Sequence, residues 1–198
     1  MTEMKFFVYG SMTEGLVHFS KIKDFVLSSQ PAQIKGSAYR LKVGYPVVLE
    51  EGQDMVSGLV VTLNNNALLI GLLDEFHGLS SLHPEKSLYH RKEVVADLGD
   101  SKEIVNTYFL NPAKLPKNSV HIENGDWILS LQQQPALTDK LSDRQRSYIL
   151  KLGASSGRDI VPIDLPLYRE LMNLELIVDK GRRLALSKLG HEVYRYLT

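Results

Sequence analysis

Short apolar runs separated by turn residues fill the chain from Lys5 to Leu110. Apolar runs of this length are typical of β-strands, and Gly, Pro and Asn between them are typical of turns. The predicted strands cover 5–9, 33–42, 46–50, 55–63, 88–98 and 104–110. Helical spacing of apolar residues predicts only two short helices, over 17–27 and 67–76, the second capped by Asn64–Asn66 and closed by Gly78. Many strands with few helices favour an α+β fold class with a mixed, β-barrel-like sheet.

The pattern changes after residue 131. Residues 132–136 are polar and interrupted by proline, which is typical of a linker. Ser142 and Asp164 then stand where helix N-caps are expected. Two short β-like runs around Gly181 predict a hairpin, and Ser187 would cap a last helix. The order helix, helix, hairpin, helix predicts a small winged-helix-like domain. We therefore predict two domains, 1–131 and 137–198.

Charge differs between the two halves of the chain, although its 23 basic and 23 acidic residues cancel. Residues 1–136 hold 12 basic and 15 acidic residues, a balance of −3. Residues 137–198 hold 11 basic and 8 acidic residues, a balance of +3. This excess is far below the clustering expected of a dedicated nucleic-acid-binding domain. Nucleic acid is therefore not the favoured partner of the second domain.

The chain contains no cysteine, so neither disulfides nor thiolate metal sites can form. Its first residues lack the apolar core of a signal peptide, and no segment approaches the apolar length of a membrane span. We expect a cytoplasmic protein without membrane contact.

A series of short motifs follows in order along the first two thirds of the chain. It begins with a Tyr-Gly-Ser-Met turn directly after the first predicted strand. The later members are a Gly-Tyr-Pro turn, a Leu-Asp pair at a helix end, a Tyr-x-Arg strand start and a Gly-Asp-Trp triplet, at Gly44–Pro46, Leu73–Asp74, Tyr89–Arg91 and Gly125–Trp127. With these motifs the chain resembles the gamma-glutamylcyclotransferase-like family.

The resemblance implies a reaction and a set of binding residues. In that family the α-amine of a γ-glutamyl group attacks its own side-chain carbonyl, which forms 5-oxoproline and releases the attached amine. The enzyme class is an acyltransferase, and no cofactor is implied. Backbone donors of the Tyr-Gly-Ser-Met turn would hold the substrate. The substrate-binding residues would be Tyr9, Gly10, Ser11, Met12, Tyr89 and Arg91.

The family's catalytic base is a glutamate in a Leu-Asp-x-x-Glu-Gly motif, and here that position is His77, the expected catalytic residue. Glu75 is no substitute because it lies about 200° around the helix from His77. By reference pKa values of about 6.5 and 4.3, neutral imidazole accepts a proton more readily than a carboxylate. Imidazole attracts the substrate ammonium more weakly, however, because it carries no negative charge. We therefore expect standard cyclotransferase activity to be weak or absent.

Other interpretations of the same residues stay open at this point. His77 could be a helix-end histidine whose charged form is favoured by free carbonyls. Tyr89 and Arg91 share one face of a strand and could be a packing pair. His77, His83 and His90 fall on a helix end, a loop and a strand, a spacing that predicts no metal site.

Three kinds of function remain. The chain could be an enzyme that cyclises a γ-glutamyl amine or a related small amide. It could be a catalytically degenerate module that senses such a metabolite, with the C-terminal domain acting on a protein partner or on its own N-terminal domain. It could also be a nucleic-acid-binding regulator that works through the winged helix.

Overall fold

The computed structural model describes residues 3–64, 67–156 and 159–198. The chain divides into two compact units. Unit 1 comprises Met1–Leu41 and Tyr45–Gln133, and unit 2 comprises Lys42–Gly44 and Gln134–Thr198.

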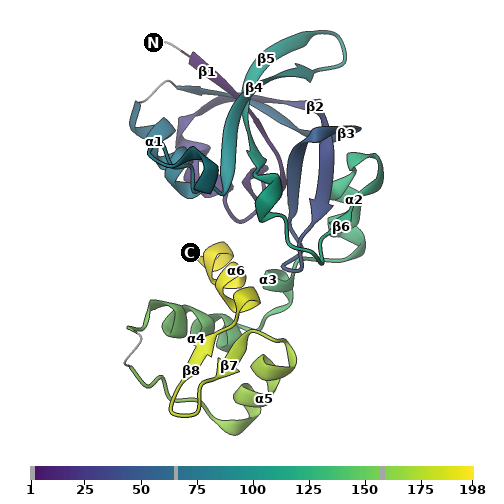
Figure 1. The fold of residues 1–198 in the computed structure, drawn as a ribbon. Coiled ribbons are helices and arrows are strands. Elements are labelled where there is room, and N and C mark those ends of the chain that lie inside the picture. Colours follow the sequence, from purple (N-terminus) through teal and green to yellow (C-terminus); the bar gives the residue numbers. More distant parts are fainter. Residues whose placement is uncertain (1–2, 65–66, 157–158) are drawn as a thin grey trace. The chain divides into compact units, whose positions relative to one another are not determined.

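Unit 1 is built around a closed β-barrel (Figure 1). Its strands are β1 (Glu3–Val8), β2 (Val26–Arg40), β3 (Pro46–Asn64), β4 (Tyr89–Asp97), β5 (Lys102–Leu110) and β6 (Val120–His121). Hydrogen-bonded neighbours follow the order β3-β1-β5-β4-β2, and β2 pairs again with β3, so that five strands form a ring and β6 extends β2. Strands β1 and β5 are parallel, whereas the other pairs are antiparallel. The predicted α+β class with a mixed, barrel-like sheet is confirmed.

The two longest strands, β2 and β3, pair along nearly their whole length, from Arg40 opposite Pro46 to Val26 opposite Leu63. The register shifts between Gly36, opposite Asp54, and Ser37, opposite Leu49, so residues 50–53 bulge out of the pairing. The prediction of two strands separated by a turn at 51–53 is therefore wrong. These residues form a bulge inside one strand, because β2 pairs with the segments on both sides of it.

Among its described residues, unit 1 has two α-helices, α1 (Ala67–Phe76) and α2 (Trp127–Gln133). The predicted bounds of α1 are confirmed, and Gly78, with a φ of 61°, follows its end as a left-handed glycine does. Of the predicted Asn64–Asn66 cap, residues 65–66 lie outside the described residues. The sequence patterns do not predict α2. Unit 1 also contains the 3-10 turns η1 (Gly10–Met12), η4 (Pro84–Lys86), η5 (Pro112–Lys114) and η6 (Glu123–Gly125), besides two that are described below.

The helix predicted over 17–27 is wrong. The segment instead forms two 3-10 turns, η2 (Phe19–Lys21) and η3 (Lys23–Phe25), and Val26 already belongs to β2. The end of the predicted helix is instead taken up by sheet pairing, because Val26 lies opposite Leu63 of β3.

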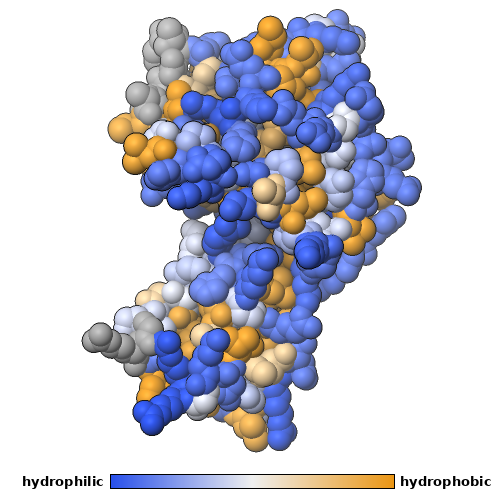
Figure 2. Space-filling model, in the orientation of Figure 1, coloured by the Kyte–Doolittle hydropathy of each residue, from blue (hydrophilic) through white to orange (hydrophobic). Residues whose placement is uncertain are grey.

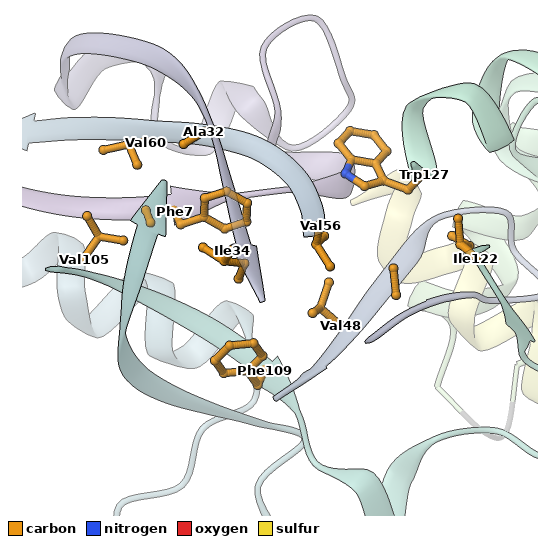
Figure 3. Packing of buried hydrophobic residues seen from close by; sticks show 12 residues of the cluster. Phe7, Ala32, Ile34, Val48, Val56, Val60, Val105, Phe109, Ile122 and Trp127 are labelled. Atoms are coloured by element: carbon orange, nitrogen blue, oxygen red, sulfur yellow. The ribbon is translucent and has the colours of Figure 1, made fainter. Parts of the chain in front are cut away.

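Two buried clusters fill unit 1, and β1 contributes to both because its side chains alternate between its faces. Phe7 joins the first cluster with Ile34, Phe109 and Trp127 (Figure 3). Trp127 is 1% exposed and donates from its indole N–H to the carbonyl of Ser57 over 2.6 Å. Trp127 is therefore a core residue of unit 1. The second cluster joins β1 to α1, and its buried members are Phe6, Val8, Met12, Ile22, Val61, Leu63, Leu69, Leu73 and Tyr108.

Unit 2 is a small α/β unit. Its elements are α3 (Leu137–Lys140), α4 (Asp143–Ala154), α5 (Leu165–Asn173), β7 (Ile177–Asp179), β8 (Leu184–Leu186) and α6 (Lys188–Leu197). The three predicted caps are confirmed. The side chains of Ser142, Asp164 and Ser187 each accept a hydrogen bond from the backbone N–H of the residue three positions later. The predicted order of two helices, a hairpin and a last helix is present, preceded by the short α3. The winged-helix assignment of this unit stays a prediction.

Close packing in unit 2 depends on Gly190 of α6. A Cβ atom at this position would lie 2.0 Å from the carbonyl oxygen of Leu176, which precedes β7. Leu176 and Gly190 are both buried, so the two backbones meet inside unit 2. None of the helices in the described parts of the chain has the length and apolar character needed to cross a bilayer.

Candidate functional site

The Tyr-Gly-Ser-Met turn follows β1 directly and forms η1. Gly10 has a φ of 58°, a conformation that favours glycine, and a Cβ atom there would lie 3.0 Å from the Pro46 side chain. The turn is closed by a hydrogen bond of 3.0 Å from the backbone N–H of Thr13 to the carbonyl of Gly10. The first motif of the sequence therefore lies against the proline of the second motif.

Tyr9 connects this turn to β5. Its hydroxyl donates a hydrogen bond of 2.8 Å to the backbone carbonyl of Tyr108. Met12 is buried in the cluster that also contains Tyr108 and Leu73 of α1. The turn, β5 and the end of α1 thus meet in one place, although they are far apart in the sequence.

His77 follows α1 and lies in an aromatic environment. Its ring stacks on Tyr108 with centroids 3.7 Å apart and planes inclined by 3°, and it meets Tyr89 edge-on at 5.3 Å. Its Nδ1 atom lies 2.8 Å from the carbonyl oxygen of Leu73, to which Nδ1–H donates. Within the described residues Nε2 makes no hydrogen bond. In this tautomer Nε2 holds the lone pair, so it is the atom that can accept a proton.

Burial keeps the His77 ring neutral. It lowers the pKa of His77 from 6.5 to about 4, the hydrogen bond to Leu73 opposes this change, and the nearby His18 lowers the pKa further. The helix-end interpretation is therefore right about the carbonyl contact and wrong about the charged form. Loss of hydration outweighs the attraction of the carbonyl.

Asp74 lies near His77 but is engaged by two other groups. The hydroxyl of Tyr108 donates to Asp74 Oδ1 over 2.7 Å, and Arg91 Nη1 lies 3.1 Å from the same oxygen. Asp74 and His77 are three residues apart and so share one side of α1, whereas Glu75 is exposed. Burial and the Asp74 carboxylate both raise the pKa of Tyr108, so its phenol keeps its proton. The Asp74 carboxylate is thus bound by the Arg91 guanidinium and by the Tyr108 phenol.

His18 is a residue that sequence reasoning missed. Its Nδ1 atom lies 2.9 Å from Ser11 Oγ, and its backbone N–H donates to the Ser11 carbonyl over 2.8 Å. The side chain is 3% exposed and packs edge-on against Phe76, the neighbour of His77. The sequence offers no signal for this contact beyond a histidine seven positions after the serine.

The expected site residues lie around Tyr108 and the end of α1. Tyr89 contacts the His77 ring, and Arg91 pairs with Asp74. His83 is exposed and lies beside Glu85, and among the described residues no group of three side chains forms a metal-binding arrangement. The predicted cavity beside the Tyr9–Met12 turn stays a prediction.

A cavity of about 430 Å³ lies elsewhere in unit 1, between β2, β6 and α2. Its lining includes Arg40, His121 and Ser130. Arg40 Nη1 donates to both the carbonyl and the hydroxyl of Ser130 at 3.2 Å, which fixes the guanidinium at α2. Asp126 of the Gly125–Trp127 motif lines this cavity, whereas none of the expected catalytic and substrate-binding residues does.

Comparisons with known proteins give the following relatives. Residues 6–129 match the family model described as "Gamma-glutamyl cyclotransferase, AIG2-like". The structure of YkqA from Bacillus subtilis is similar, with 22% sequence identity and a TM-score of 0.50, over 67% of this chain and 42% of that chain. An AIG2-like protein from Mus musculus shows 15% identity and a TM-score of 0.47, over 59% of this chain and 82% of that chain. The protein c4763 of uropathogenic E. coli shows 15% identity and a TM-score of 0.48, over 67% of this chain and 98% of that chain. No curated protein matches the sequence.

Proposed function

Because the chain belongs to the AIG2-like gamma-glutamyl cyclotransferase family, we propose that unit 1 binds a γ-glutamyl amine or a related small amide beside the Tyr9–Met12 turn. His77 takes the position of the catalytic glutamate, and any turnover yields 5-oxoproline by acyl transfer. The observation that carries this proposal is the position of the His77 ring. It stacks on Tyr108, whose carbonyl also receives the Tyr9 hydroxyl of the turn.

Binding with little turnover is the expected behaviour. The reference pKa of about 6.5 would make imidazole a better base than a carboxylate at about 4.3. With its pKa lowered to about 4, His77 loses that advantage and still lacks the negative charge that attracts the substrate ammonium. An α-ammonium with a pKa of about 8 would give up its proton to such a base with an unfavourable free energy of roughly 5 kcal/mol.

Release of 5-oxoproline from γ-glutamyl dipeptides tests the catalytic part of the proposal. We expect slow or undetectable release by the wild type and by His77→Ala, and a measurable gain in His77→Glu. General-base catalysis contributes about 10²–10⁴-fold, so a partial gain would be visible. The gain should be incomplete, because the new carboxylate would lie near Asp74, which already occupies Arg91.

The matched control is His191→Glu, which makes the same chemical change at an exposed residue of α6. Calorimetric titration with a γ-glutamyl dipeptide measures binding independently of turnover. Robust wild-type release that His77→Ala retains would show that another residue carries the chemistry. Absence of both binding and release would overturn the proposal.

A second candidate function concerns unit 2. Lys180, Arg182 and Arg183 are exposed on the turn between β7 and β8, and none of the three forms an ion pair within the described residues. Free cations on a hairpin tip are suited to phosphate contacts, as in a winged-helix regulator. The neighbouring helix α5, however, exposes both a negative and a positive side chain, Glu170 and Arg169. Charges of both signs favour a protein partner over nucleic acid.

Titration of the full chain with duplex DNA at several salt concentrations separates these partners. We expect weak binding with a shallow salt dependence, because three phosphate contacts predict a log–log slope of only about −3. Tight binding with a steep slope, removed by replacing the three cations with alanine, would make nucleic acid the partner.

A further inference from the structure

The contact between the Ser11 hydroxyl and the His18 ring has no role in the cyclisation described above. We propose that Ser11 is a nucleophile that takes an acyl group from a small amide, with His18 as its general base. This gives unit 1 an acyl-transfer activity that does not require the substrate's own α-amine. The proposal rests on the proposed function only for the γ-glutamyl class of the acyl group.

The geometry of the pair fits a nucleophile and its base. Ser11 Oγ and His18 Nδ1 are 2.9 Å apart, within the 2.6–3.2 Å range that proton transfer requires. The bond of 2.8 Å from the His18 backbone N–H to the Ser11 carbonyl closes the intervening loop. The Phe76 ring, 4.8 Å away and inclined by 74°, holds the imidazole from the side of α1. A base fixed from two directions is positioned before the substrate arrives.

The two side chains differ in exposure in the manner that this chemistry needs. His18 is 3% exposed, whereas Ser11 is only half-buried and can meet a ligand. Next to this turn, Thr13 Oγ1 is buried and makes no hydrogen bond within the described residues. A buried hydroxyl without a partner is unfavourable, and a polar ligand in the turn would relieve it.

The reaction balances without a cofactor. Ser11 Oγ attacks the γ-carbonyl carbon, and the hydroxyl proton passes to His18 Nδ1 while Nε2 carries the other ring proton. The tetrahedral intermediate expels the amine, which takes the proton that His18 Nδ1 received from Ser11. A γ-glutamyl ester remains on Ser11. The substrate's α-amine can then attack the ester to give 5-oxoproline. Water or hydroxylamine attacking instead gives glutamate or a γ-glutamyl hydroxamate. In each path the attacking amine, water or hydroxylamine loses a proton, and Ser11 Oγ gains one as the ester bond breaks.

With an ester intermediate, His77 could be a weaker base and still support cyclisation. The bond that the α-amine must break is then to an alkoxide leaving group, which departs more readily than an amide nitrogen. A neutral imidazole could serve for this step, although it lacks the charge of a glutamate.

The test uses a substrate that cannot cyclise. N-acetyl-γ-glutamyl-p-nitroanilide has a blocked α-amine, so release of p-nitroaniline requires attack by the enzyme, by water or by hydroxylamine, and the loss in Ser11→Ala separates the enzyme's attack from the other two. We expect the wild-type chain with hydroxylamine to release p-nitroaniline and to form the matching hydroxamate. Ser11→Ala should lower both rates at least about 100-fold. Ser20→Ala, at an exposed serine of η2, should leave both rates unchanged.

His18→Gln separates a catalytic role from a structural one. Glutamine can keep a hydrogen bond to Ser11 but cannot take its proton, so the rate should fall about as far as in Ser11→Ala while the circular dichroism spectrum stays that of the wild type. If His18→Gln keeps the wild-type rate, His18 only positions the loop and the proposal is wrong.

The unblocked substrate, γ-glutamyl-p-nitroanilide, is the control for a binding site that has no room for the acetyl group. Hydroxamate formed from it and lost in Ser11→Ala supports the nucleophile. Cyclisation without hydroxamate from either substrate would overturn the Ser11 proposal and leave the proposed function intact. Absence of all products and of dipeptide binding would overturn both.

Discussion

Mild acid should destabilise unit 1 through His77. The pKa of this ring is about 4 in the folded chain and 6.5 in the unfolded chain, so the unfolded chain binds more protons between these values. The contribution of His77 to stability is therefore fully present above pH 6.5 and is lost as the pH falls toward 4. The variant His77→Gln keeps an amide donor for the Leu73 carbonyl and removes the titration.

The magnitude follows from the two pKa values. A difference of about 2.5 corresponds to roughly 3 kcal/mol once the pH is below 4. Between pH 7 and pH 5 the wild type should lose about 2 kcal/mol more than His77→Gln. Both figures are upper limits, because His77 keeps some exposed surface and its charge would be partly screened.

Urea unfolding at the two pH values measures this loss. Trp127 is the only tryptophan of the chain and is buried in unit 1, so its fluorescence reports the unfolding of the unit that contains His77. His191→Gln, at an exposed histidine of unit 2, is the control and should behave as the wild type. Equal losses in wild type and His77→Gln would refute the neutral buried imidazole.

Three further substitutions test the packing and the site. Gly190→Ala should destabilise unit 2 by about 3 kcal/mol in thermal unfolding, because its Cβ meets the Leu176 carbonyl, and an unchanged melting temperature would contradict this. Gly71→Ala, at an exposed position of α1 with open space around its Cβ, should stabilise unit 1 by roughly 0.5–1 kcal/mol in urea unfolding. Tyr108→Phe keeps the stacking on His77 and removes the hydroxyl from Asp74. It should destabilise unit 1 by about 1–2 kcal/mol in urea, and full stability would show that this hydrogen bond contributes nothing.

Local signals predict structure well in this chain. Ser142, Asp164 and Ser187 locate three helix starts because a cap bonds to a backbone group only three residues away. The bulge at 50–53 could not be predicted in this way. A glycine beside polar residues looks like a turn until the pairing of β2 with both flanking segments is known.

In the candidate site, too, the sequence predicts what depends on neighbouring residues and does not predict contacts between distant segments. The motif around His77 locates the end of α1 and the residue that replaces the glutamate. The stacking on Tyr108, the pairing of Asp74 with Arg91 and the contact of His18 with Ser11 depend on the folded barrel. The lowered pKa of His77 follows from that burial, so a reference value misjudges its basicity.

The ring of strands has a consequence for the order in which the chain can fold during synthesis. The antiparallel pairing of β2 with β3 joins nearby segments and can form as soon as residue 64 has left the ribosome. The gap between β1 and β4 is filled only by β5, which begins at Lys102 and lies parallel to β1. Until then both strands present unpaired backbone edges, which invite pairing with other chains. A ribosome that pauses before Lys102 would therefore hold the chain in its most aggregation-prone form.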